Sequence, residues 1–145
     1  HYPRNRFVAG FLGSPQMNFL QVRALSASSE AVEIEMPGGY RMRVLVDGTG
    51  VEPGEELTLG VRPEHLNVVS TGAGRMQVTA DVSERLGSDT FCHVRCTSGE
   101  MLTVRVRGDF APRYGDALTL DFDTAHCHLF DADGQAVAKP LQQAA

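Results

Sequence analysis

Hydrophobic and polar residues alternate with a period of two along most of the chain. Val32, Ile34 and Met36, for example, are separated by Glu33 and Glu35. Successive side chains of an extended strand point to opposite faces, so this spacing gathers the apolar residues on one face. The pattern predicts a half-buried strand.

A β-hairpin is predicted between residues 32–36 and residues 41–46. Pro37-Gly38-Gly39 stands between them and is a strong turn signal. In such a hairpin the two glutamates would lie opposite Arg41 and Arg43, and opposite charges on neighbouring strands stabilise each other.

The same alternation recurs to the end of the chain. It predicts further strands at Leu57–Val61, Met76–Val82, Phe91–Cys96, Leu102–Val106, Leu118–Phe122, His126–Phe130 and Ala136-Val137. Many short strands separated by turn residues indicate an all-β protein, built as an antiparallel sandwich or barrel.

One short segment departs from the period of two. Between Arg4 and Gly13 the apolar residues are spaced as on one face of a helix. Pro15 cannot continue a helix, so the expected helix ends before it.

Composition limits the classes of function. No run approaches the roughly 18 apolar residues of a membrane-spanning helix. The net charge of −5 disfavours nucleic-acid binding. The three cysteines are an odd number, which argues against a disulfide framework and fits a reducing cytosol.

Motifs for ATP hydrolysis are not visible in the sequence. Lys139 is the single lysine, and no glycine-rich loop precedes it, so a phosphate-binding P-loop is not expected. We therefore predict that this chain alone is not an enzyme. Because it begins with His1 and not with methionine, we expect a domain taken from a longer protein.

Two stretches carry a resemblance to a known family. Phe7–Leu20 reads FVAGFLGSPQMNFL and Leu59–Leu66 reads LGVRPEHL. Together they resemble the region after the nucleotide-binding domain in ATP-binding subunits of carbohydrate-type ABC importers, the maltose and sn-glycerol-3-phosphate group. Glu84–Thr90 and Cys127–Asp131 are also similar to that family.

The resemblance implies a transport-associated OB-like (TOBE-like) antiparallel barrel made of two interleaved lobes. Residues 1–16 would be a linker helix after the ATPase core, and residues 17–72 the first lobe. Residues 73–138 would form the second lobe, and residues 139–145 a disordered tail.

The resemblance also assigns structural roles to residues of the family motifs, and no catalytic, cofactor-binding or metal-binding residue. In the motif Arg62-Pro63-Glu64-His65, the arginine and the glutamate are interpreted as structural ion-pairing residues at a strand end. The structural set is Gly13, Ser14, Pro15, Asn18, Gly60, Arg62, Pro63, Glu64 and His65.

The function implied by the resemblance is regulation and dimerisation of an ABC importer for sugars, polyols or glycerol-3-phosphate. The expected partners are a second copy, an N-terminal ATPase domain holding ATP and Mg²⁺, the permease subunits indirectly, and a cytosolic regulatory protein. The expected location is the cytoplasmic face of the bacterial inner membrane. The candidate docking or dimer surface is Glu84, Arg85 and Gly87.

Three alternatives involve a bound ligand. A small-ligand or oxyanion site at Gly87–Thr90 is suggested because related transport-associated domains bind molybdate, although Asp89 would oppose an anion. A single-stranded nucleic acid could lie along Arg95, Arg105 and Arg107.

The third alternative is a metal site, because cysteines and histidines cluster in two segments. The closely spaced pairs typical of zinc sites are missing, and buried free cysteine is common, so we interpret the thiols as core residues. The residues concerned are Cys92, His93, Cys96, His126, Cys127 and His128.

Overall fold

The computed structural model describes residues 17–69, 76–107 and 112–137. The helix expected between Arg4 and Gly13 lies outside these residues, together with the motif residues Ser14 and Pro15. The expected tail, residues 139–145, and the expected lobe boundary after residue 72 lie outside them as well.

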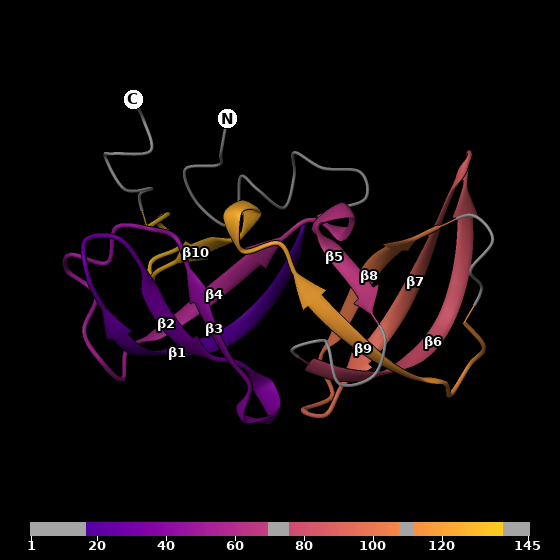
Figure 1. The fold of residues 1–145 in the computed structure, drawn as a ribbon, viewed down its shortest axis with the longest axis horizontal. Coiled ribbons are helices and arrows are strands. Elements are labelled where there is room, and N and C mark those ends of the chain that lie inside the picture. Colours follow the sequence, from indigo (N-terminus) through magenta and orange to yellow (C-terminus); the bar gives the residue numbers. More distant parts are fainter. Residues whose placement is uncertain (1–16, 70–75, 108–111, 138–145) are drawn as a thin grey trace.

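The described residues form two antiparallel sheets of five strands each, which lie side by side along the long axis of the molecule (Figure 1). The first sheet has the order β10 (His128–Phe130), β4 (Glu56–Val61), β1 (Asn18–Ala27), β2 (Val32–Glu35) and β3 (Arg41–Val44). The second has the order β5 (Leu66–Val69), β9 (Ala117–Phe122), β6 (Met76–Leu86), β7 (Asp89–Cys96) and β8 (Met101–Val106).

Two strands are exchanged between the halves of the chain. β5 follows β4 directly but pairs with β9 in the second sheet. β10 comes near the end of the chain but pairs with β4 in the first sheet. The all-β prediction with two interleaved lobes is therefore confirmed.

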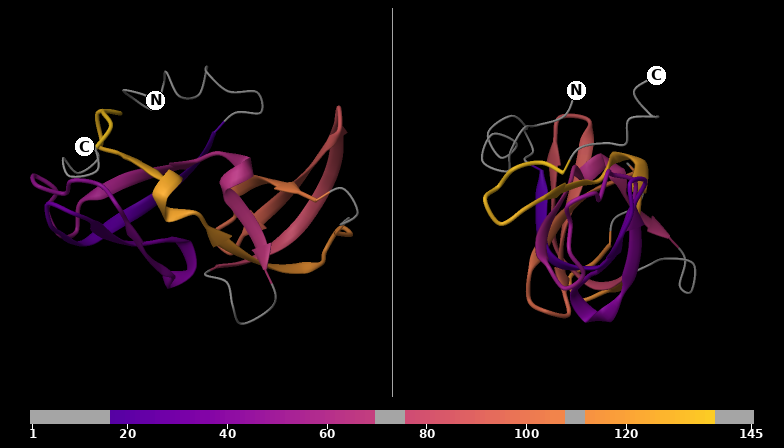
Figure 2. Two further views of the ribbon diagram at one scale, coloured as in Figure 1. Left: turned by 45° about the horizontal axis from the view of Figure 1, so that its top comes forward. Right: turned by 90° about the vertical axis from the view of Figure 1, so that its left-hand side faces the viewer.

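A short 3₁₀ helix makes each of the two crossings. η2 (Pro63–His65) leads from β4 to β5, and η3 (Thr124–His126) leads from β9 to β10. Both lie at the junction between the sheets, where Figure 1 shows η2 as a magenta coil and η3 as an orange one. Figure 2 shows the strands of both sheets curving around a common long axis.

The hairpin predicted from the first alternation is confirmed. Glu33 lies opposite Arg43, and Glu35 lies opposite Arg41. The connection is a third 3₁₀ helix, η1 (Pro37–Gly39), in which Gly38 has a φ of 88°. A side chain is strained at this positive φ, which explains the glycine in the turn.

The strand expected at Met76–Val82 is longer than predicted, and Val82 does not point into the core. Its exposed fraction is 58%, although Met76 and Ala80 are buried. The register shifts between Ala80 and Ser83, so one extra residue of β6 enters the pairing with β7. This β-bulge reverses the alternation of buried and exposed side chains along β6, so Val82 faces outward.

The strand expected at His126–Phe130 is also wrong in its first part. His126 ends η3, and its amide donates to the carbonyl of Asp123 at 2.9 Å, so only His128–Phe130 is extended. Ala136 makes a single bridge to Phe130 where a short strand was expected.

One hydrophobic cluster joins both sheets. It contains Leu59 from the first sheet and Leu120 from the second, both fully buried. The three thiols are buried free cysteines in the same cluster, as expected for small core residues: Cys92, Cys96 and Cys127.

Gly60 is a motif residue whose lack of a side chain has a packing cause. A Cβ at this position would come within 2.8 Å of both Met17 Sδ and Phe130 Cε2. The methionine is flexible and can move, but the ring of Phe130 is completely buried.

We therefore expect Gly60→Ala to destabilise the fold by about 1–3 kcal/mol through overpacking. Equilibrium urea unfolding measures this change. The control Glu56→Ala, at the exposed start of the same strand, is expected to stay within about 0.5 kcal/mol. Equal effects of the two substitutions would contradict the packing argument.

Candidate functional site

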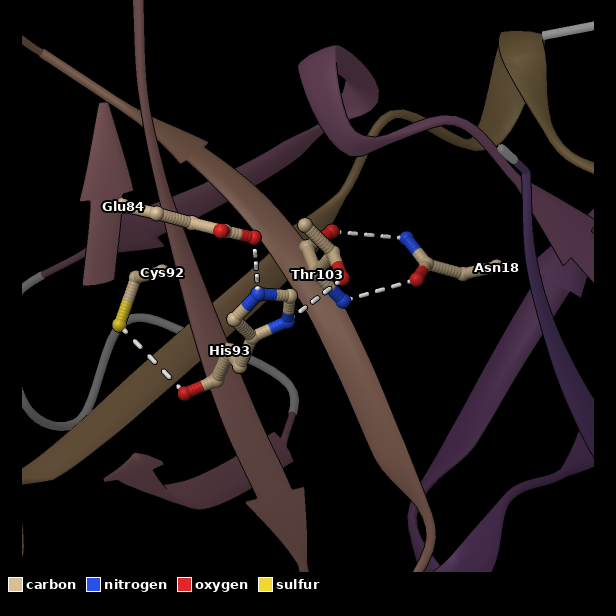
Figure 3. Close-up of polar contacts among 5 residues, drawn as sticks. All are labelled: Asn18, Glu84, Cys92, His93 and Thr103. Carbon is tan, nitrogen blue, oxygen red and sulfur yellow. Dashed lines mark hydrogen bonds and ion pairs between the residues drawn. The ribbon is translucent and has the colours of Figure 1, made fainter. Parts of the chain in front are cut away.

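Asn18 fastens the first sheet to the second. From the start of β1, its side-chain amide donates to the carbonyl of Thr103 at 2.8 Å, and its side-chain oxygen accepts from the Thr103 amide at 2.8 Å (Figure 3). Thr103 lies on the edge strand β8, so these backbone groups have no strand partner on that side. The Asn18 side chain takes the place of a neighbouring strand.

The contact continues outward through His93. The Thr103 hydroxyl lies 3.0 Å from His93 Nδ1, and His93 Nε2 lies 2.8 Å from Glu84 Oε1. Glu84 is more than half exposed, whereas Asn18 is almost buried. A four-residue polar relay, Glu84–His93–Thr103–Asn18, thus runs from the surface of β6 to the first sheet (Figure 3).

The outer three groups have the order carboxylate, imidazole and hydroxyl that activates a nucleophile in some hydrolases. Such a site also needs oxyanion donors and a substrate cavity. Three grooves in the described part of the chain are lined by side chains that do not belong to the relay. The geometry therefore supports a mechanical link between the sheets.

The motif Arg62-Pro63-Glu64-His65 forms the end of β4 and the crossing turn η2. Pro63 is buried at the first position of the turn, where a missing amide hydrogen has no cost. Within the described part of the chain, no ion pair involves Arg62 or Glu64. The expected ion-pairing role is thus not seen there.

His65 instead contacts the other crossing. Its ring stacks on the ring of His126, with centroids 4.1 Å apart and planes 16° from parallel. The carbonyl of His65 also accepts a hydrogen bond from the Asp123 amide at 3.0 Å. The two crossing turns are therefore tied together by one stack and one backbone hydrogen bond.

The imidazole of His65 is unfavourably placed for a positive charge. Its Nδ1 is buried and has no hydrogen-bond partner among the described residues. Burial lowers the pKa of His65 below its usual range, and neighbouring His126 lowers it further. The carboxylates of Glu64 and Asp123 act in the opposite direction and with smaller effect.

The expected docking residues lie on an exposed hairpin arm formed by the ends of β6 and β7. Glu84 and Arg85 are exposed, and Gly87 turns the arm with a φ of 66°. The relay engages one of these residues, because the Glu84 carboxylate contacts His93.

The cysteine and histidine segments do not converge. The described residues contain no group of three or more possible metal ligands of the His, Cys, Asp or Glu type. Burial, together with the charge of Glu100, raises the pKa of Cys96 to about 11, and burial also raises that of Cys92. Both thiols on β7 point into the core and stay protonated at neutral pH.

A polar groove of about 430 Å³ brings together parts of two sequence hypotheses. Ser88 and Asp89 come from the turn considered for an oxyanion, and Arg105 and Arg107 from the face considered for nucleic acid. Glu64 also lines the groove, so groups of both signs border it. Arg95, the third arginine of the nucleic-acid hypothesis, does not line this groove and instead pairs with Asp81, with Nη2 3.0 Å from Oδ2.

Three of the four relay residues were singled out in the sequence, each for another role. Asn18 came from a family motif, Glu84 from a loop resemblance and His93 from the metal alternative, whereas Thr103 was not identified. Asn18 and Thr103 are 85 positions apart, so no local pattern reveals their contact. The only available signal was the polar position of Thr103 between two apolar strand residues.

Comparison with known families agrees with this fold. Residues 59–130 match the family model of the TOBE domain, and residues 13–66 match that of the MalK OB fold domain. The chain belongs to the MalK-type family of OB-fold and TOBE domains. The two matches overlap at residues 59–66, which contain the crossing motif Arg62–His65.

Close relatives carry the name maltose/maltodextrin import ATP-binding protein MalK. The protein of Vibrio vulnificus (strain YJ016) is 40% identical over 139 residues, covering 94% of this chain and 37% of the relative. That of Yersinia pestis is 37% identical over 144 residues, covering 99% and 39%. The chain thus spans little more than a third of the relatives it matches.

A solved structure shares the fold at low sequence identity. It is the cytoplasmic molybdate-binding protein ModG with molybdate bound, with a TM-score of 0.67 and 13% identity, covering 77% of this chain and 94% of that one.

In the described ranges of our chain, no helix has the length and apolar character needed to cross a membrane.

The relay predicts unequal effects for its buried and its outer contacts. Asn18→Ala leaves an amide and a carbonyl of Thr103 without a partner, so we expect a loss of about 1–3 kcal/mol in the free energy of unfolding. His93→Gln removes the outer contacts, those of the imidazole with Glu84 and with the Thr103 hydroxyl, and is expected to cost less than about 1 kcal/mol. Urea unfolding compares the two variants, and a larger effect of His93→Gln would contradict the assignment.

Proposed function

We propose that this chain is the C-terminal regulatory and dimerisation domain of an ABC importer's ATP-binding subunit. The observation that carries the proposal is the 40% identity to a maltose/maltodextrin import ATP-binding protein across 94% of the chain. Maltose or maltodextrin is the favoured solute class, and polyols or glycerol-3-phosphate remain the alternatives of the resemblance. The ATP and Mg²⁺ sites are assigned to an N-terminal domain of the parent protein.

In this role the domain acts by holding two copies of the subunit together. A twofold contact between identical domains keeps the attached ATPase domains at high effective concentration while they open and close. The assembly would meet its permease subunits at the cytoplasmic face of the membrane, through the ATPase domains.

A cytosolic regulatory protein is proposed to bind the hairpin arm that carries Glu84, Arg85 and Gly87. A regulator that binds one arrangement of the two subunits more tightly than another shifts the population toward it. The arm is suited to such contact because its charged side chains are exposed and its base is fixed to the body through His93.

The surface is tested by exchanging its charges. We expect the double variant Glu84→Arg and Arg85→Glu to weaken self-association or regulator binding by at least about tenfold, since each new charge would face a like charge on the partner. Sedimentation equilibrium of the chain measures self-association, and transport by the parent protein measures regulation.

The matched control exchanges Glu33→Arg and Arg43→Glu, a cross-strand pair of the first sheet. Both double variants keep the net charge of the chain. If the Glu84/Arg85 exchange changes neither self-association nor any regulatory response, the arm is not the docking surface.

A second candidate function is recognition of a small oxyanion in the polar groove. The specific observation is that Arg105, Arg107 and Ser88 line one groove, since arginine and hydroxyl groups bind tetrahedral anions. For this function, molybdate or sulfate must raise the melting temperature of the chain in a saturable way. This rise in melting temperature must disappear in the double variant Arg105→Gln and Arg107→Gln. If neither anion raises the melting temperature of the unaltered chain, the function is excluded.

Nucleic-acid binding is not part of the proposed function. Two titrations with single-stranded DNA, at low and high salt, test this exclusion. Affinity that falls steeply with salt would restore the nucleic-acid alternative.

A further inference from the structure

The two sheets repeat one plan. Strands β1 to β4 occupy the same positions in the first sheet as β6 to β9 in the second, and β10 and β5 fill the corresponding edge positions. The crossing turns η2 and η3 also correspond, because each joins the fourth strand of one sheet to the exchanged strand of the other. His65 and His126 hold the same last position in these two turns.

The two histidines meet where the crossings meet. Their stacked rings and the hydrogen bond from the Asp123 amide to the His65 carbonyl join η2 to η3. The carboxylate of Asp123 also lies 2.8 Å from His126 Nδ1. His126 therefore has a charged partner for a proton, and the buried Nδ1 of His65 has none within the described ranges.

A proton on His65 is unfavourable in this contact. It gives the buried Nδ1 a hydrogen without an acceptor, and it places a positive charge about 4 Å from the stacked ring of His126, which also opposes the charged form of His65.

The surrounding charges do not make a proton on His65 favourable. Glu64 and Asp123 favour the charged form of His65, whereas Arg62 and His126 oppose it, and burial outweighs each of them. The other charged or titratable residues on the strands around the turns are Arg41 and Arg43 of β3, Glu56 of β4, Arg105 of β8, Asp121 of β9 and His128 of β10.

We propose that the His65–His126 stack is an acid-sensitive joint between the two crossings. At neutral pH the stack closes the joint and keeps the exchanged strands β5 and β10 in place. On acidification a proton on His65 separates the rings, and the crossings open.

The direction of the pH effect follows from proton binding. His65 binds a proton less readily in the closed joint than in the open one, so acid favours opening. Its stabilising contribution is complete above about pH 6.5 and is lost as the pH falls through the lowered pKa of the folded protein.

Amide hydrogen exchange of the 145-residue chain tests the proposal, because the Asp123 amide donates across the joint. After correction for intrinsic rates, its opening constant should stay level from pH 7 to about pH 6.5 and rise by up to about tenfold per pH unit between there and pH 5.5. Amides in the centre of the β1–β4 pair serve as the internal reference and should change less. An Asp123 amide that is equally protected at both pH values overturns the proposal.

Two variants assign the effect to the stack. His65→Phe keeps a ring but cannot be protonated, so the extra acid-induced exchange should disappear. His128→Gln removes a nearby histidine outside the stack and should keep it. If His65→Phe does not fold, His126→Gln replaces it. The acid-induced exchange should then become smaller without vanishing, because the burial of His65 Nδ1 remains, and an unchanged acid response in the folded variant overturns the proposal.

Discussion

The hydrogen bonds of β10 to β4 and of β5 to β9 join each half of the chain to the sheet of the other half. The rest of the structure depends on this exchange, because it places apolar residues of both sheets in one core. It also requires the chain to cross twice between the sheets, at η2 and η3. The family motif Arg62–His65 lies at one of these crossings, so its composition reflects the geometry of a turn.

Polar contacts then fix how the sheets lie against each other. The amide of Asn18 satisfies the backbone of the edge strand β8, which protects that edge from pairing with another chain. His93 and Glu84 extend this contact toward the exposed arm. The relay thus gives an exposed carboxylate a continuous connection to the strand that follows the N-terminal segment of the chain.

Much of the fold could be predicted from alternation and turn residues, and the remainder depended on contacts between distant residues. The hairpin of β2 and β3 followed directly from its pattern, including the opposed charges. Val82 was wrongly predicted to face the core, because the pattern of apolar residues does not reveal the β-bulge that adds a residue to its strand. His126 was wrongly predicted to begin a strand, because a 3₁₀ turn of only three residues has no distinct pattern of its own. Of the candidate site, Asn18, Glu84 and His93 were singled out in the sequence, but the polar position of Thr103 in its strand did not reveal a contact 85 positions away.

The shared strand order of the two sheets also bears on how such a chain arises. Two identical five-stranded units that exchange their last strand form a symmetric pair, and joining them end to end gives the connectivity seen here. After such a fusion the two copies are free to diverge, because only one of each pair of equivalent positions must keep its original residue. In this chain two such equivalent positions, His65 and His126, still touch, because their rings stack where the crossings meet.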